Sequence, residues 1–241
     1  MVQIGLNDNE KKVFVNGIQT AITNDIPDII HENRLPTKNG NGQFRWNFLH
    51  KRVAESLGEN FQIHYERRGA WEVLILFESN LGLTFSIMSE STFSALQKKT
   101  SKMRHYLSAL VFKNKTSDAF ELQTEMEICK VECDFLQIEQ LREKILSDFS
   151  GIIENHILIL FDSNFDIVKS VRAVLLTIQL EVAFSEDWSY LLEKPHLNAS
   201  ECFIFDKTME ETEPLVSLKP VKQDDQSSDF VRIARKKNDA V

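Results

Sequence analysis

The sequence is poor in cysteine, glycine and proline. Its 241 residues include 3 Cys, 8 Gly and 5 Pro. So few glycines and prolines exclude a collagen-like or low-complexity chain. The three cysteines, Cys129, Cys133 and Cys202, cannot form an even-numbered disulfide framework. We therefore expect reduced thiols and a cytoplasmic protein.

Long apolar runs are also missing. The longest, at 156–161 and 173–178, have the length of a strand, whereas a membrane-spanning helix needs roughly 18 or more apolar residues. The first residues, MVQIGLNDNEKK, lack the apolar segment of a secretory signal. The sequence therefore predicts no membrane span and no secretion signal.

Positive charge is in deficit as well. The chain has 28 Lys and Arg against 36 Asp and Glu, which gives a net charge of −8. A protein that binds duplex DNA usually carries excess cations, because it displaces counterions from phosphates. The balance favours a protein partner and leaves nucleic acid open where cations gather locally. Phenylalanine, in contrast, is abundant with 17 residues, which favours a well-filled apolar core.

Residues 43–113 contain the clearest succession of elements. An amphipathic pattern predicts a helix over 43–57. A helix over 90–102 and a strand over 105–112 are expected further along the chain. Between them, segments separated by short polar turns predict an antiparallel meander of three strands, over 61–67, 71–78 and 83–89.

The rest of the chain adds further helices and strands. Apolar residues at three- and four-residue spacing predict a helix over 135–149. A short helix is expected over 186–192. Apolar or alternating segments predict strands over 126–133, 156–161, 173–183 and 201–206. The fold class is therefore α+β, with a mixed or mainly antiparallel sheet and flanking helices.

Composition divides the chain into three parts. Residues 1–34 form an N-terminal helical segment, and residues 35–206 form the α+β main domain. Residues 207–241 hold few large apolar side chains and many charges. Such a segment cannot bury enough apolar surface to offset the entropy of ordering. We expect a flexible tail there.

The order helix, three strands, helix, strand is shared by nucleases of the restriction-enzyme type. Those enzymes place an acid on the second strand and Glu-x-Lys or Asp-x-Lys on the third, to hold Mg²⁺ and position water. Here the second strand carries Glu72 and Glu78 at its ends, and the third has Ser86 and Met88 where the acid and the lysine would lie. Glu90 follows without a lysine two residues later. We therefore assign no catalytic residue.

Metal-ligand patterns are weak. Cys129 and Cys133 make one pair, whereas a structural zinc site usually needs two. The segment 162–166, Asp-Ser-Asn-Phe-Asp, lacks the later Gly and Glu of a calcium-binding loop and is better explained as a polar turn. No HExxH, Gly-x-Ser-x-Gly or Gly-rich phosphate loop is present. We expect no metal ion and no cofactor.

A set of arginines and tryptophans is the best candidate binding surface. Arg45 and Trp46 lie near the start of the helix over 43–57, and Arg67, Arg68 and Trp71 lie in the first hairpin. Arg and Trp are the residue types most enriched at binding hot spots, and they also suit stacking on single-stranded nucleic acid. The alternative interpretation is that the tryptophans belong to the core and the arginines are solvated.

Several motifs in this region together resemble an uncharacterised family of proteins from Gram-positive bacteria and their phages. They are an Asn-Gly turn followed by FRWNFL, then RRGAW, an apolar strand, and SIMSE before a helix. The resemblance covers roughly residues 35–185. It implies a bacterial, phage or mobile-element setting, and it carries no catalytic residue.

These observations favour a non-enzymatic protein-interaction module, although enzymatic activity is left open. One alternative is a nucleic-acid-processing enzyme or toxin with a diverged nuclease-like core. That alternative requires Glu55, Glu72 and Glu78 to converge in one concave site. The other alternative is a nucleic-acid-binding regulator, whose affinity for nucleic acid should fall steeply with salt.

Overall fold

The computed structural model describes residues 4–34, 40–69, 71–115, 132–164 and 166–193. Several sequence predictions fall on residues outside these ranges. They are residues 126–131 of the strand predicted over 126–133, the strand over 201–206, the tail over 207–241, Cys129 and Cys202. Residues 132 and 133 of that first strand belong instead to a helix, so the prediction is wrong there. The division into parts at residues 34 and 206 stays a prediction.

The described fold is built on one six-stranded sheet. Its strands follow one another in chain order across the sheet. All neighbouring pairs are antiparallel except β3 and β4, which are parallel. The strands are β1 (Phe61–Arg68), β2 (Trp71–Glu78), β3 (Leu83–Ser89), β4 (Asn155–Asn164), β5 (Ile167–Leu176) and β6 (Val182–Asp187).

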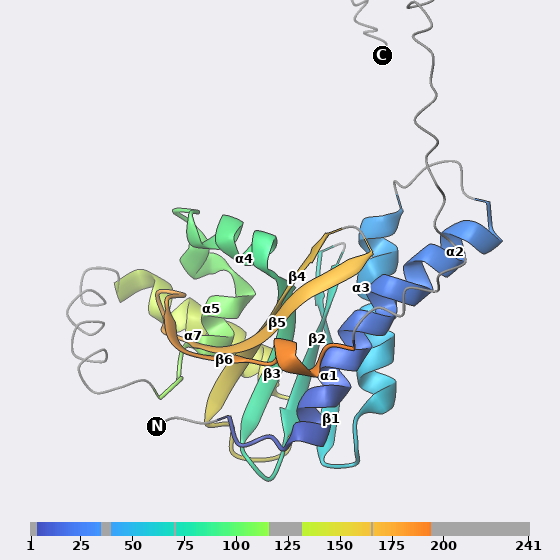
Figure 1. The fold of residues 1–241 in the computed structure, drawn as a ribbon. Helices are drawn as coiled ribbons and strands as arrows, with labels where there is room; N and C mark the ends of the chain where they lie inside the picture. Colours follow the sequence, from blue (N-terminus) through green and yellow to red (C-terminus); the bar gives the residue numbers. More distant parts are fainter. Residues whose placement is uncertain (1–3, 35–39, 70, 116–131, 165, 194–241) are drawn as a thin grey trace, which may run out of the picture. The chain divides into compact units, whose positions relative to one another are not determined.

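Helices cover the sheet in two groups (Figure 1). The first group is α1 (Asp8–Thr20), the π-helical turn η1 (Ala21–Asp25), α2 (Ile26–Glu32) and α3 (Asn41–Ser56). The second group lies on the other side of the sheet: α4 (Glu90–Gln97), the 3-10 turn η2 (Lys102–Arg104), α5 (Tyr106–Val111) and α7 (Glu132–Leu146). A last 3-10 turn, η3, spans Ser189–Leu191. The fold class is α+β with a mixed, mainly antiparallel sheet, as the sequence predicted.

The predicted meander of three strands and the helix before it are confirmed. The tight turns between the strands depend on Gly69, at φ +67°, and Gly82, at φ +66°. Glycine adopts this left-handed region without the steric cost of a side chain. The helices predicted over 90–102 and 135–149 are also present, with the bounds of α4 and α7.

Two of the predicted strands are wrong. Residues 106–111 form helix α5, which begins where the His105 side chain accepts a hydrogen bond from the Leu107 amide at 3.2 Å. A short apolar run has no period that separates a buried helix from a strand. The alternating segment 173–183 is not one strand, because β5 ends at Leu176 and a turn with Leu180 at φ +61° leads into β6.

Alternation along the central strands divides the core between the two helical groups. Phe85 and Ile87 of β3 join the cluster that contains Phe14 of α1. The Phe14 ring lies 5.4 Å from that of Phe85. Met88 of β3 belongs instead to the cluster under α4 and α5, together with Leu158. The sheet is therefore apolar on both faces.

One polar group is built into the core at the β3–β4 pair. His156 is 1% exposed, and burial lowers its pKa to about 3. Thr84 Oγ1 donates to the Asn155 carbonyl at 3.3 Å, so it accepts from His156 Nδ1 at 3.0 Å. Ser86 Oγ then donates to His156 Nε2 at 2.9 Å. A neutral imidazole with both nitrogens paired is the form that a buried site tolerates.

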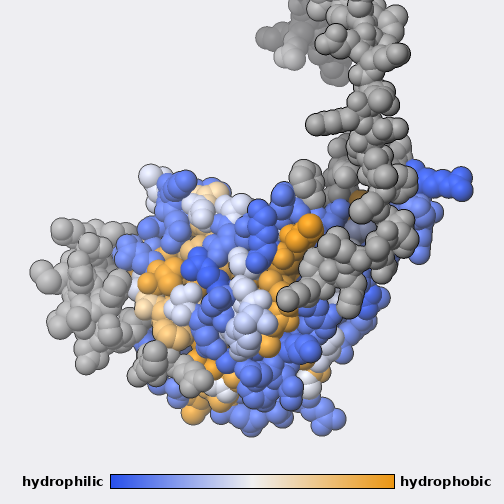
Figure 2. Space-filling model, in the orientation of Figure 1, coloured by the Kyte–Doolittle hydropathy of each residue, from blue (hydrophilic) through white to orange (hydrophobic). Residues whose placement is uncertain are grey.

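The outer surface in the view of Figure 2 is mostly hydrophilic, with hydrophobic groups reaching it over β5. This strand begins with Ile167, whose side chain is 56% exposed. In the described residues, β5 lines neither of two hollows that lie beside α3 and the β1–β2 hairpin.

The contact between α1 and α3 gives the first testable prediction. A Cβ added at Gly17 of α1 would lie 2.7 Å from Val53 Cγ2 and 3.2 Å from the Val53 amide nitrogen of α3. Gly17→Ala should therefore lower the free energy of unfolding by about 1–3 kcal/mol, although alanine favours helices. Urea denaturation followed by circular dichroism measures the change.

The matched control is Gly42→Ala in α3, where an added Cβ meets no atom within 4 Å. This substitution should leave the stability unchanged or raise it by about 0.5 kcal/mol. Equal effects at Gly17 and Gly42 would contradict the close packing of the two helices.

Candidate functional site

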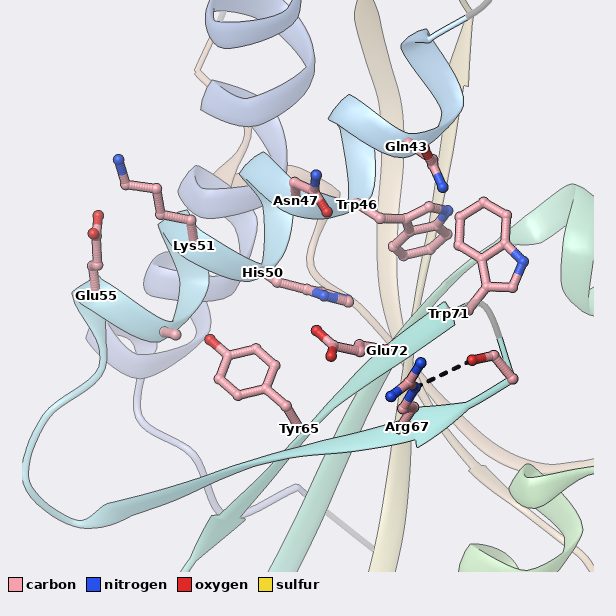
Figure 3. Close-up of a pocket in the computed structure, with 12 residues that line it drawn as sticks. Gln43, Trp46, Asn47, His50, Lys51, Glu55, Tyr65, Arg67, Trp71 and Glu72 are labelled. Atoms are coloured by element: carbon pink, nitrogen blue, oxygen red, sulfur yellow. Dashed lines mark hydrogen bonds between the residues drawn. The ribbon is translucent and has the colours of Figure 1, made fainter.

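A hollow of about 620 Å³ lies between α3 and the β1–β2 hairpin (Figure 3). Helix α3 supplies one wall and the hairpin supplies the other. Its lining residues from α3 are Gln43, Trp46, Asn47, His50, Lys51, Ala54 and Glu55. Those from the hairpin are Tyr65, Arg67, Gly69, Trp71 and Glu72.

Aromatic rings form much of the wall of this hollow. The side chains of Trp71 and Tyr65 are 50% and 47% exposed. Trp46 and His50 are one helical turn apart on α3, and their ring centres are 5.8 Å apart. The His50 ring lies 6.4 Å from that of Tyr65. Figure 3 shows the two indole rings beside each other at one end of the hollow. A planar ligand could therefore stack on exposed ring faces.

A second hollow of about 500 Å³ adjoins the first. The two share Trp46, His50, Trp71 and Glu72. The second extends past the carboxyl end of β3 toward the first residues of α4 and α5. Its other lining residues are Arg68, Val73, Ile87, Met88, Thr92, Arg104, His105 and Tyr106. We call the two hollows together the trough.

Cations outnumber carboxylates along the trough. The cations are Lys51, Arg67, Arg68 and Arg104, and the carboxylates are Glu55 and Glu72. Arg68 lies 3.8 Å from Glu66 and 5.9 Å from the centre of the Tyr106 ring. Among the described residues, the other three cations form no ion pair. The trough is therefore a local positive surface on a chain whose net charge is −8.

The two histidines of the trough are neutral at pH 7. Burial lowers the pKa of His50 to about 4. Burial and the nearby cations Arg68 and Lys99 lower the pKa of His105 to about 4. His105 Nδ1 accepts from the Leu107 amide, so its proton resides on Nε2. Both imidazoles therefore act as uncharged aromatic rings with one donor each.

The pKa of Tyr65 depends on burial and on two carboxylates. Its pKa is raised by burial first and then by the negative charges of Glu55 and Glu72. Both carboxylates therefore act on the same hydroxyl. Figure 3 shows Glu72 pointing into the hollow between His50 and Arg67, with Glu55 at the end of α3.

The structure brings four of the five candidate binding residues together. Trp46, Arg67 and Trp71 line the first hollow, and Arg68 lines the second. Arg45 lines neither hollow. Its Nε is buried and has no hydrogen-bond partner in the described part of the chain. Whether these residues bind a ligand stays a prediction.

Sequence reasoning missed the residues that complete the trough. His50 follows Trp46 by four residues, which places both on one face of a helix. This four-residue spacing could have identified His50 as a neighbour of Trp46. Tyr106 and Arg104 carried none. Tyr106 lies in a segment predicted as a strand, Arg104 lies just before it, and the distance of both from α3 depends on the crossover after β3.

The carboxylates required for a nuclease do not converge in the described residues. Glu72 lies near the start of β2 and Glu78 at its end, about 20 Å away along the strand. Glu78 Oε2 instead accepts from the Leu81 amide at 2.5 Å, in the β2–β3 turn. Glu90 forms a bidentate pair with Arg172, at 2.5 and 2.9 Å. Ser86 is paired with His156.

Metal ligands are not grouped in the part of the chain that the structure describes. No set of three or more His, Cys, Asp or Glu side chains there could hold a metal ion. The segment 162–166 lies at the β4–β5 connection, with residues 162–164 still in β4. Cys133 lies in α7.

Comparison with known proteins links the chain to a family. A model of a family of unknown function, DUF5986, matches residues 3–233. No curated protein and no solved structure matches the chain. Among the described residues, no helix has the length and apolar character that crossing a membrane requires.

The two tryptophans of the trough should differ in how much each contributes to the stability of the fold. The ring of Trp46 packs on the core, 6.0 Å from that of Phe161, whereas Trp71 is 50% exposed. Trp46→Ala should lower the free energy of unfolding by about 2–3 kcal/mol, and Trp71→Ala by less than about 1 kcal/mol. Urea denaturation measures both. A larger loss at Trp71 would show that it is a core residue.

Proposed function

The chain belongs to the DUF5986 family of unknown function, and we propose that it is a non-enzymatic binding module that holds single-stranded nucleic acid in the trough. The observation that carries this proposal is the trough lining. There, exposed aromatic rings lie together with three cations, Lys51, Arg67 and Arg104, that form no ion pair among the described residues. Single-stranded nucleic acid offers the matching groups, unpaired base faces and phosphates.

Stacking supplies the first part of the interaction. Trp71 and Tyr65 expose about half of their side chains, so ring faces are accessible before any ligand arrives. Stacking of one base on an aromatic side chain contributes about 1–3 kcal/mol and tolerates every base. Duplex DNA hides its base faces, so it cannot use these rings.

Phosphate contacts supply the second part. Arg67 lines the first hollow and Arg104 the second, and both are exposed. Lys98 and Lys99 are exposed between α4 and η2, and the half-buried Lys102 begins η2, two residues before Arg104. Guanidinium and ammonium groups that lack an internal partner bind phosphate without first breaking an ion pair.

A protein partner is the second candidate, and it was the first choice from the sequence. It is favoured by β1, the edge strand, where Ile63 is 41% exposed two residues before Tyr65. Recovery of one stoichiometric protein on affinity purification from the native host would support it. The nuclease alternative has less support, because Glu55 and Glu72 line the trough without Glu78.

The setting of this activity also stays a proposal. The three cysteines, too few for an even-numbered disulfide framework, support a cytoplasmic location. The motifs around Trp46 and Trp71 support a bacterial, phage or mobile-element context.

The test is fluorescence anisotropy with a labelled single-stranded DNA of about 12 nucleotides and mixed sequence. We expect the affinity to fall roughly tenfold between about 50 and 200 mM NaCl, because about three phosphates are neutralised. A duplex of the same length should bind more weakly. Arg67→Ala and Arg104→Ala should each weaken binding and flatten the salt dependence.

Lys12→Ala is the matched control. Lys12 is an exposed cation of α1 and lines neither hollow, so its loss should leave the affinity unchanged. Absence of binding at the lower salt concentration, or an equal loss in Lys12→Ala, would contradict the proposal. Competition by deoxycytidine monophosphate as effective as that by the unlabelled strand would identify a free nucleotide as the ligand instead.

A further inference from the structure

Glu72 is out of place in a surface that binds phosphate. It is the second residue of β2, is exposed and lines both hollows. Figure 3 shows its carboxylate directed into the first hollow, between His50 and Arg67. A carboxylate at the centre of the trough repels a phosphate brought close to it. The position of Glu72 therefore favours a ligand group that carries no negative charge and donates a hydrogen bond.

The Glu72 carboxylate also lacks a partner among the described residues. In the register of the β1–β2 hairpin, Arg67 is the direct cross-strand neighbour of Glu72. Even so, the Glu72 side chain makes no hydrogen bond or ion pair among the described residues. Other carboxylates of the same sheet are paired, for example Glu66 with His64 at 3.5 Å. Glu72 is thus free to accept hydrogen bonds from a ligand.

Base chemistry identifies the donor. An ionised carboxylate can only accept, so it pairs with N–H groups of a base. Cytosine offers its N4 amino group, adenine its N6 amino group and guanine its N2 amino group. Thymine has an O4 carbonyl where cytosine has the amino group, and this oxygen would face the negative charge. The two pyrimidines therefore differ at the atom that a carboxylate reads.

We infer that the Glu72 carboxylate selects the base held in the trough, by accepting a hydrogen bond from an exocyclic amino group, and so favours cytosine over thymine. This inference rests on the proposed function, because it needs a base stacked against Trp71 or Tyr65. The indole and phenol rings hold the base plane, and Glu72 reads its edge. Arg67 and Arg104 bind phosphate and do not distinguish bases.

The experiment compares oligo(dC) and oligo(dT) strands of about 12 nucleotides by anisotropy, because both are flexible pyrimidine strands. The native chain should bind oligo(dC) about tenfold more tightly than oligo(dT). Glu72→Gln places an amide there that both donates and accepts. This variant should bind the two strands almost equally, mainly through a gain in affinity for oligo(dT).

The Glu55→Gln variant tests whether the preference for one base depends on the total charge of the trough. It removes the same negative charge from the rim of the same hollow. It should strengthen binding of both strands alike and keep their ratio. Because Glu72 and Glu55 are exposed, both variants should keep the native circular dichroism spectrum and unfolding midpoint.

The outcomes distinguish failure of the proposed function from failure of the inference about Glu72. If neither strand binds, the proposed function fails. If both strands bind without a preference for cytosine, or if Glu72→Gln keeps the preference, the inference alone is overturned. Equal loss of the preference in Glu55→Gln also overturns it, because total charge would then account for the effect.

Discussion

Because β3 and β4 are parallel neighbours, the chain between Ser89 and Asn155 must return from the end of β3 to the end of the sheet where β3 begins. A hairpin turn cannot make this connection. The described helices of that return, α4, α5 and α7, cover one face, and α1, α2 and α3 cover the other. The carboxyl end of β3 is left between the two groups, beside the β1–β2 hairpin. The trough lies there, so its position is a consequence of the crossover and not of a single motif. Buried polar pairing of His156 with Thr84 and Ser86 fixes the same two strands to each other.

Local patterns were sufficient for much of this fold. The helix α3 and the strands β1 to β3 follow from apolar spacing and short turns, and the structure has them within one or two residues of the predicted bounds. Failures occurred where the pattern was ambiguous. The run 106–111 is mostly apolar, and all of α5 except Tyr106 is buried. The alternation of 173–183 continues through a turn that needs Leu180 in a left-handed conformation. A leucine at positive φ has no sequence signature, because this residue type rarely adopts that conformation.

The candidate site was predictable in part for the same reason. Trp46, Arg67, Arg68 and Trp71 are close in sequence within two adjacent elements, so residue type and a short helix–hairpin unit were enough to group them. Tyr106 and Arg104 reach the trough from beyond the meander, and no periodicity in one sequence encodes that contact. Arg45 shows the limit of residue type alone, because it lies one position from Trp46 and on a different side of α3.

The central claim is that the trough is the functional surface and that its aromatic rings and unpaired cations act as one site. Hydrogen–deuterium exchange of the full chain, with and without a saturating single strand of about 12 nucleotides, tests it most directly. The account predicts slower exchange in the first half of α3, in the β1–β2 hairpin and around η2 and the start of α5, with α1 and β6 unchanged. Protection confined to α1 or β6, or no change in the trough on binding, would contradict it.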